Sequence, residues 1–336
     1  MSYNLKPNVG ISCGDPNGIA LEVILKSLKE SMILDLITPI VFCDFDIISY
    51  QNDFFKTKLD LEVINKNQPP KPNKINVFHI DEHDFKTEFG KSTFKAGSIA
   101  LSSLERTVDA LRNGWADFIV TGPINKKNIQ SKEFNFPGHT DYLSNIFNTD
   151  SLMFMISDKL KVGLLTDHVP LTSVVDNLSF QKIFDKIKIM HFSLKNDFSI
   201  KDPRIALLSV NPHAGDDGVI GGDDLKILIP AVKKISDLGF KVSGPYPADS
   251  YFGSGLFNQY NATMAVYHDQ GLIPFKTISF GKGINYTAGL GKIRTSPDHG
   301  TAYNIAGKNI ANHLSLKNSI LCGSVSYTHL TLPTKA

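Results

Sequence analysis

The sequence has few of the features that mark secreted, membrane or nucleic-acid-binding proteins. Its three cysteines, Cys13, Cys43 and Cys322, are odd in number, far apart and without a CxxC pair. This excludes a disulfide framework and a zinc knuckle, and favours a reducing cytoplasm. No apolar run approaches the ~20 residues of a membrane span, and the N-terminus MSYNLKPNVG lacks the regions of a signal peptide. The net charge is only +2 and no basic run carries interleaved aromatics, so we expect no nucleic-acid partner.

The remaining composition is that of an ordinary globular α/β protein. A chain of 336 residues with 42% apolar and 20% charged residues can form two domains or one large unit. Two short apolar runs, Val9–Cys13 and Asp117–Thr121, break into the glycine turns GDPNG and GPINK. A strand, a tight turn and a helix in this order point backbone N–H groups at an anion. A plain turn explains each motif equally well, and the GxGxxG fingerprint is absent. Lys126 is either an anion contact or a solvated lysine.

Three further apolar strands lead to a histidine. These segments are Lys161–His168, Arg204–His213 and Ala262–His268. The carboxyl ends of parallel strands meet at one edge of a sheet, where ligands bind in open α/β folds. Three imidazoles at that edge suit a divalent metal ion with positions left open for substrate. Taken singly, each would be read as a satisfied histidine at a strand end.

Other polar residues stand where a ligand could use them. His139 precedes a predicted helix that Thr140 or a neighbour could cap, which places His139 beside the positive end of that helix. The chain is glycine-rich from Phe280, and Arg294 offers a planar fork for a phosphate or carboxylate. Long loops in compact domains are usually functional, although a surface loop is the alternative.

Seven motifs in sequence order resemble one family. They are GDPNGIALE, TGPINK, PGHTDYL, NPHAGDDG, PADSYF, YHDQGLIPFK and RTSPDHGTAYNIAGK. From about Val9 to Cys322 the chain resembles the 4-hydroxythreonine-4-phosphate dehydrogenase family. The resemblance implies an isocitrate/isopropylmalate-dehydrogenase-like α/β fold, with two α/β/α domains around a cleft, working as a homodimer. It places a cofactor-side domain at residues 1–135 plus 281–323 and a metal-binding and dimerisation domain at 136–280. The closing helix of the family gives way here to SVSYTHLTLPTKA, so we expect residues 324–336 to be a non-native tail.

The resemblance also implies a set of site residues. It implies NAD and one divalent metal ion (Zn, Mg, Co or Mn) per site, at the interface between two subunits. The metal ligands would be His168, His213 and His268. Substrate contacts would be His139, Thr140, Lys276, Asn285 and Arg294. Candidate NAD contacts are His299, Gly300, Thr301, Ala302 and Asn304.

The implied reaction is a metal-dependent oxidation in vitamin B6 biosynthesis. NAD would oxidise 4-(phosphooxy)-L-threonine to a β-keto acid, which decarboxylates to 3-amino-2-oxopropyl phosphate. Lys276, expected beside the metal, is the first candidate for proton transfer and Asp249 the second. Alternatives are a same-fold dehydrogenase of 4-phosphoerythronate or of a cis-dihydrodiol, and a non-redox acyl-transfer or binding protein. His139, Lys126 and Arg294 together favour a phosphorylated substrate.

Overall fold

A computed structural model describes residues 6–81, 84–132 and 134–331 of the chain. The chain divides into two compact units, one formed by residues 1–142 and 292–331 and the other by residues 143–291. The division expected from the sequence placed the two boundaries at residues 136 and 281. Helix α5 (His139–Phe147) begins in the first unit and ends in the second.

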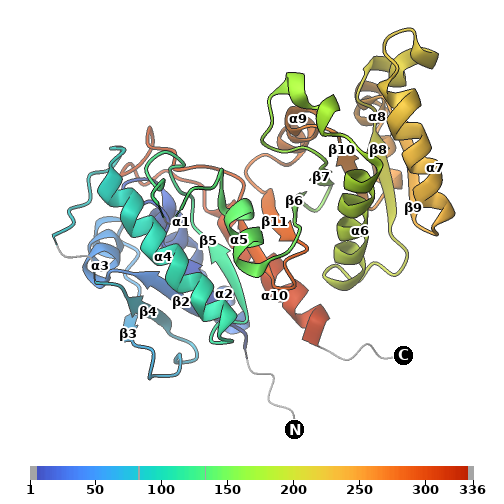
Figure 1. Cartoon of the computed structure of the whole chain (residues 1–336). Coiled ribbons are helices and arrows are strands. Elements are labelled where there is room, and N and C mark those ends of the chain that lie inside the picture. Colours follow the sequence, from blue (N-terminus) through green and yellow to red (C-terminus); the bar gives the residue numbers. More distant parts are fainter. Residues whose placement is uncertain (1–5, 82–83, 133, 332–336) are drawn as a thin grey trace. The chain divides into compact units, whose positions relative to one another are not determined.

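The first unit is built on a parallel sheet (Figure 1). Its strands lie in the order β3, β4, β2, β1, β5, β12, and each neighbouring pair is parallel. The strand bounds are β1 Asn8–Ser12, β2 Thr38–Cys43, β3 Leu61–Ile64, β4 Ile75–His79, β5 Phe118–Thr121 and β12 Arg294–Pro297. Strand β2 is buried at every position, as expected for a parallel strand covered on both faces. All the turns that follow these strands therefore open at the same edge of the sheet.

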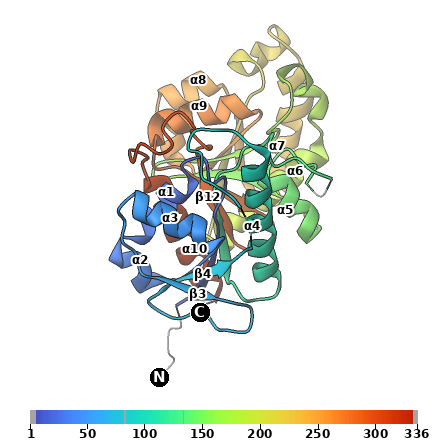
Figure 2. The ribbon, with the colours of Figure 1, turned by 90° about the vertical axis from the view of Figure 1, so that its left-hand side faces the viewer.

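Helices cover both faces of this sheet. Helix α4 lies on one face, and α1, α3 and α10 cover the other (Figure 2). The helix bounds are α1 Ala20–Leu28, α2 Ser31–Leu36, α3 Phe45–Phe54, α4 Phe94–Arg112 and α10 Leu314–Thr331. Helix α4 begins at the Thr93 N-cap, whose side chain accepts from the Ala96 N–H, and it buries an apolar stripe at helical spacing.

The second unit has a mixed sheet. Its strands lie in the order β11, β6, β7, β10, β8, β9. Strand β6 is antiparallel to both of its neighbours, and the pairs from β7 to β9 are parallel. The strand bounds are β6 Leu152–Ile156, β7 Lys161–Leu164, β8 Arg204–Leu208, β9 Lys241–Tyr246, β10 Ala262–Ala265 and β11 Ile284–Ala288. The three strands expected to lead to histidines, β7, β10 and β8, are thus adjacent and parallel.

Helices also cover both faces of the second sheet. Helices α6 and α7 lie on one face and α8 and α9 on the other (Figure 1). The bounds are α6 Phe180–Asn196, α7 Ile229–Asp237, α8 Ala248–Gly253 and α9 His268–Ser279, with short turns η1 Leu171–Ser173, η2 Val175–Asn177, η3 Pro212–Gly218, η4 Asp224–Leu228 and η5 Leu256–Gln259. The core under α9 joins Leu272 and Phe275 to residues of β7, β8 and β10 and to Tyr251 of α8.

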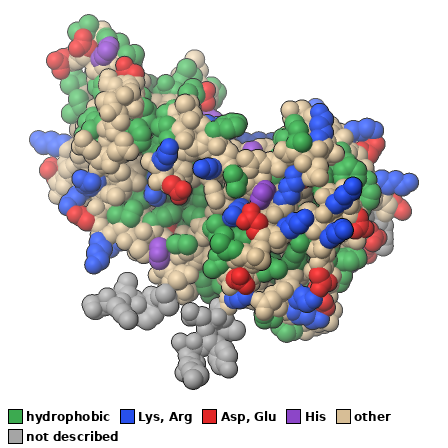
Figure 3. Space-filling view, turned by 180° about the vertical axis from the view of Figure 1, so that it is seen from behind, with side chains coloured by type: hydrophobic (Ala, Val, Ile, Leu, Met, Phe, Trp, Pro, Cys, Tyr) green, Lys and Arg blue, Asp and Glu red, His purple; other side chains and the backbone are tan. Residues whose placement is uncertain are grey.

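Two observations concern the apolar helices and the surface charge of the chain. No helix in the described part of the chain has the length and apolar character needed to cross a membrane. Basic and acidic side chains are interspersed on the face drawn in Figure 3, without a large area of one sign.

The end of the chain differs from the sequence-based expectation. We expected the last helix to stop near Cys322, but α10 continues to Thr331, and only residues 332–336 of the expected tail lie outside the described part. Ser324 and Ser326 face the core, and Tyr327 donates a 2.7 Å hydrogen bond to Asp117. These tertiary contacts override the strand propensity of the segment.

Candidate active site

A buried arginine is the most distinctive group of the first unit. Arg294 opens β12 and is 1% exposed. Strand β12 pairs with β5, so Arg294 lies next to Thr121 at the end of that strand, and its Nε and Nη2 donate to the Thr121 hydroxyl at 3.1 and 2.6 Å. Burial lowers the pKa of Arg294 to about 9, which leaves the guanidinium protonated at neutral pH. The strand end therefore holds a fixed positive charge in a site of low dielectric constant.

His139 lies close to this charge. The Nε2 atom of His139 is buried and has no hydrogen-bond partner among the residues that the structure describes. Burial lowers the pKa of His139 well below its usual value, and the nearby positive charges of Arg294 and Lys126 lower it further. The ring is therefore neutral at pH 7. A buried polar atom without a partner is costly, and an incoming ligand could supply the missing bond.

Lys126 and Thr140 complete the surroundings of His139. A Cβ placed on Gly138, the residue before His139, would lie 3.8 Å from Lys126 Cε, so the lysine chain runs beside the start of α5. Thr140 is the second residue of that helix. Hydrogen-bond donors suited to a phosphate therefore gather near the start of this helix. They are the guanidinium of Arg294, the ammonium of Lys126 and the neutral imidazole of His139. In the second unit, taken by itself, Oδ1 of Asn285 in β11 is buried and has no hydrogen-bond partner within the described ranges of the chain.

Two turns of the first unit pack tightly against each other. They are the turn after β1 and the 299–304 turn, defined here as residues His299 to Asn304, which contains all five candidate NAD contacts. The Ile19 N–H donates to the Thr301 carbonyl at 3.0 Å. A Cβ on Gly18 would lie 2.7 Å from the same oxygen, so only glycine fits there. His299 Nε2 is a further buried atom without a partner in the described chain.

Two of the three predicted metal ligands come together in the second unit. The rings of His168 and His268 have centroids 6.0 Å apart. A metal ion at a Zn–N distance of ~2.0–2.1 Å lies about 3 Å from each ring centroid, so two ligating imidazoles have centroids within about 6.5 Å. The observed spacing fits a shared divalent ion. The strands end earlier than expected: His168 follows β7 by four residues, and His268 is the first residue of α9.

Hydrogen bonds hold these strand ends in place. The Thr166 hydroxyl donates to the Val266 carbonyl at 2.7 Å and links the ends of β7 and β10. Gln270 accepts from the Val266 N–H and donates to the Ser209 carbonyl, which links β10 to β8. The sequence motif YHDQG therefore contains a side chain, Gln270, that ties two strands together beside the histidines.

His213, the third predicted ligand, lies in an unusual turn. Five consecutive residues of η3, from His213 to Asp217, have positive φ angles between 45° and 83°. This left-handed conformation is costly for residues with a Cβ. Asp224 is fully buried and accepts hydrogen bonds from the Val210 and Asn211 N–H groups. These bonds anchor the residues that come directly before the turn. Within the described residues of one chain, His213 does not join His168 and His268 in a compact three-ligand group.

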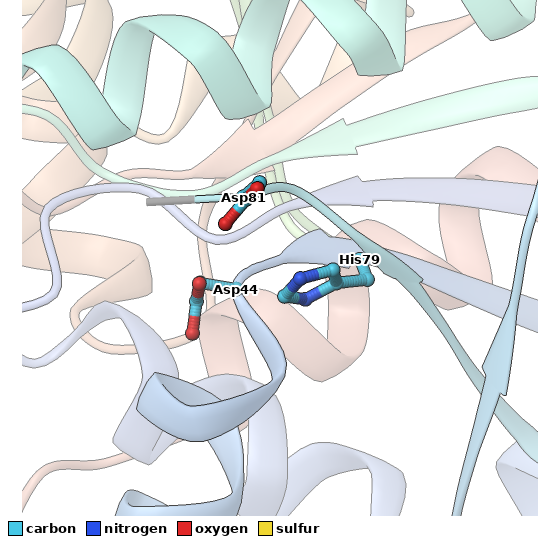
Figure 4. A group of neighbouring side chains, drawn as sticks. All are labelled: Asp44, His79 and Asp81. Atoms are coloured by element: carbon cyan, nitrogen blue, oxygen red, sulfur yellow. The ribbon is translucent and has the colours of Figure 1, made fainter. Parts of the chain in front are cut away.

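A different group of three residues does lie close enough together to be considered as a metal site. Asp44, His79 and Asp81 have potential ligand atoms within 4.8 Å of one another, at the ends of β2 and β4 (Figure 4). Sequence reasoning did not single them out. His79 Nδ1 accepts a 3.1 Å hydrogen bond from the Phe45 N–H, and Asp44 caps the same helix, α3. A metal ion bound through His79 would require that ring nitrogen to give up the bond. The contacts favour a helix-capping role.

The two candidate proton-transfer residues are exposed. Lys276 and Asp249 both lie at the surface of the single chain. We expected the run after His268 to bring Lys276 beside the metal, but the run is helical. At 1.5 Å per residue, the α9 helix separates the two residues by about 12 Å along its axis. Within one chain the helix thus places the two residues about two turns apart, and the role of Lys276 stays a prediction.

Sequence reasoning also missed residues that shape these sites. Thr121, which holds Arg294, is marked in the sequence only by its place at the end of an apolar run. Asp15 and Tyr303 form a hydrogen bond across 288 residues, and no local pattern predicts such a pair.

The fold and these residues define a class: a mixed α/β scaffold with a buried arginine and histidine in one unit and a histidine pair just beyond two strand ends in the other. A family model described as "Pyridoxal phosphate biosynthetic protein PdxA" matches residues 35–322. The chain belongs to the PdxA family. It is 41% identical to a 4-hydroxythreonine-4-phosphate dehydrogenase of Bacteroides thetaiotaomicron, over 94% of this chain and 87% of that one.

Two other relatives show the range of the family and its fold. A Clostridium botulinum protein provisionally named as a D-threonate 4-phosphate dehydrogenase is 33% identical over 95% of this chain and 96% of its own. The crystal structure of the Klebsiella pneumoniae 4-hydroxythreonine-4-phosphate dehydrogenase superposes with a TM-score of 0.83 at 32% identity, over 97% of this chain and all of that one. The family resemblance and the mixed α/β fold class expected from the sequence are both confirmed.

Proposed function

We propose that the chain is an NAD- and divalent-metal-dependent dehydrogenase that oxidises the secondary alcohol of 4-(phosphooxy)-L-threonine. The product is a β-keto acid that loses CO₂ to give 3-amino-2-oxopropyl phosphate, a step of vitamin B6 biosynthesis. Family membership supports the reaction class, and the name of the Bacteroides relative supports this substrate. The observation that carries the proposal is the buried pair of His139 and Arg294, which suits the phosphate of this substrate.

The phosphate would be held by fixed charges and one neutral ring. Arg294, already oriented by Thr121, would donate charge-assisted hydrogen bonds to the phosphate oxygens. His139 would add one bond through Nε2, and Lys126 would contribute charge. A dianionic ligand would raise the depressed pKa of His139, so binding would be coupled to proton uptake as the pH falls.

The remaining predicted residues serve the reacting end. When bound, NAD would accept the hydride and a divalent ion would stabilise charge on the substrate oxygen and during loss of CO₂. His168 and His268 would hold that ion, with His213 as the third ligand. The 299–304 turn would hold NAD. Lys276, or else Asp249, would take the proton of the alcohol, and Thr140 and Asn285 would orient the substrate.

A homodimer would complete this arrangement. Each histidine segment carries an exposed apolar side chain nearby: Leu171 (70% exposed), Val219 (83%) and Ile273 (64%). Exposed apolar side chains beside polar functional groups are typical of surfaces that a partner covers. A second subunit could bury these side chains, supply a ligand to the metal and desolvate Lys276. Sedimentation with Ile273→Asp, which should dissociate a dimer, tests this assembly.

NADH formation over a panel of alcohols tests the function. The panel contains 4-(phosphooxy)-L-threonine, its dephosphorylated form, D-threonate 4-phosphate, 4-phosphoerythronate and a cis-dihydrodiol, each with and without EDTA. We expect the highest kcat/KM for the first compound and loss of turnover with EDTA. Turnover of a dihydrodiol alone, or full activity in EDTA, would contradict the proposal.

The second candidate substrate is D-threonate 4-phosphate. The Clostridium relatives carry that name, and the identity of 33% is close to that of several 4-hydroxythreonine-4-phosphate dehydrogenases. The two substrates differ at the carbon beside the carboxylate, where one has an amino group and the other a hydroxyl. The ratio of their kcat/KM values decides between them.

A further inference from the structure

The 299–304 turn is fastened by contacts with distant segments. The Thr301 carbonyl in this turn accepts the hydrogen bond from the Ile19 N–H described above. Farther on, the Ala311 N–H donates to buried Glu22 at 2.8 Å, and Lys26 donates to the Asn309 and Ala311 carbonyls. Helix α1 and the turn before it therefore hold both ends of the loop that starts at His299.

The side chain of Tyr303 makes the central contact of this loop. Its hydroxyl donates a 2.6 Å hydrogen bond to Asp15 Oδ2, and Asp15 Oδ1 accepts from the Asn17 N–H at 2.9 Å. Asp15 is fully buried. Burial raises the pKa of Asp15, and burial together with the hydrogen bond to Asp15 raises the pKa of Tyr303 to about 12. Asn125 and Ser92 lie within hydrogen-bonding reach of the same hydroxyl. The bond is thus short, partly buried and tied to two further segments.

The backbone next to Tyr303 is in a conformation that needs such support. Ala302 has a φ of 43°, in the left-handed region that residues with a Cβ rarely adopt. A strained residue persists only where its surroundings over-determine it, and such residues collect at ligand-binding sites. Thr301 on one side and Tyr303 on the other carry the fixing bonds. The hydrogen bonds of Thr301 and Tyr303 therefore hold the strained backbone of Ala302 in place.

We propose that the Tyr303–Asp15 hydrogen bond sets the conformation of the 299–304 turn, and that Tyr303 is a positioning residue for the dinucleotide. The proposal rests on the proposed function, because the turn is the candidate NAD contact. Tyr303 would act through the backbone of Thr301 and Ala302. The hydroxyl would lower the cost of binding by holding the turn in the bound conformation before NAD arrives.

A matched control exists in the same unit. Tyr327 donates a 2.7 Å hydrogen bond to Asp117, and burial with that bond raises the pKa of Tyr327 to about 12. This pair has the same chemistry but joins α10 to the start of β5, away from the 299–304 turn. Tyr303→Phe and Tyr327→Phe remove the same atom from equivalent bonds. A merely structural role predicts similar effects of the two changes.

The test compares these variants by kinetics and by direct NAD binding. We expect Tyr303→Phe to raise the KM and the Kd for NAD about three- to tenfold, the loss expected for one hydrogen bond of this kind. The kcat and the KM for the phosphorylated substrate should stay within about twofold. Tyr327→Phe should change neither NAD constant. Asp15→Asn, which keeps an acceptor, should be milder than Asp15→Ala.

Amide hydrogen exchange provides a readout that does not depend on turnover. Exchange at residues 301–306 should be faster in Tyr303→Phe and unchanged in Tyr327→Phe. If the wild type oxidises no compound of the panel, the proposed substrate fails, while NAD calorimetry and exchange still decide this inference. Equal NAD affinity in both variants, unchanged exchange, or no NAD binding by the wild type would overturn it.

Discussion

Replacing Arg294 by lysine keeps the positive charge and removes the planar fork. The arginine donates through two nitrogens to the Thr121 hydroxyl, and in the proposed function its charge would also bind the phosphate. A lysine has a single ammonium and cannot reproduce that geometry. Losing one charge-assisted hydrogen bond to the phosphate costs about 1.5–3 kcal/mol, which corresponds to a rise in KM of about 10- to 150-fold. The kcat should fall less, because the phosphate takes no part in the transfer of the hydride or of the proton.

The assay separates phosphate binding from general damage. KM is measured for 4-(phosphooxy)-L-threonine and for its dephosphorylated form, with the Tm of each variant recorded. The dephosphorylated compound should bind Arg294→Lys and wild type equally weakly. Removing the phosphate and replacing the arginine abolish the same hydrogen bond, so the second change has no further effect. Arg112→Lys, at a side chain that is 54% exposed on α4, is the control and should alter neither constant. An unchanged KM for the phosphorylated substrate in Arg294→Lys would refute the phosphate pocket.

Three other changes test separate parts of the structure. His213→Ala should abolish metal-dependent turnover with little change in Tm, and full activity after metal stripping and re-addition would contradict its role as a ligand. Folding holds the pKa of His139 below its unfolded value, so below about pH 6.5 unfolding is accompanied by proton uptake. The free energy of unfolding should therefore keep its full value above about pH 6.5 and fall as the pH drops below it. Thermal melts of His139→Asn should show less of this acid sensitivity, and an identical pH profile would refute it. Gly18→Ala places a methyl group 2.7 Å from the Thr301 oxygen and should lower the free energy of unfolding in urea by about 1–3 kcal/mol, whereas Gly253→Ala meets open space and should change it by less than about 0.5 kcal/mol. Equal effects of the two glycine changes would contradict the close packing.

Much of the fold could be predicted because its strands are short apolar runs. The runs at Val9 and Asp117 correspond to β1 and β5 within one residue. These strands are buried on both faces, so hydrophobicity marks them without any alternation. The histidine segments were also located correctly, although each strand ends three to five residues before its histidine.

The parts that the sequence did not reveal depend on tertiary contacts. Strand β12 reads Arg-Thr-Ser-Pro, yet all four residues are buried, and hydrogen bonds to Thr121 and to the Ser319 carbonyl satisfy the Arg294 and Thr295 side chains. The glycine content of the region predicted a loop instead. Similarly, α9 continues through Pro274, so Lys276 lies two turns from His268. Local pattern carries no information about such partners.

The stoichiometry of the reaction tests the central claim most directly. NADH and CO₂ are measured together during complete conversion of 4-(phosphooxy)-L-threonine, with a divalent metal present and NAD in excess. The account predicts equal amounts of NADH, CO₂ and consumed substrate, with 3-amino-2-oxopropyl phosphate as the product and no conversion in EDTA. Conversion without NADH, or conversion that EDTA does not affect, would contradict it.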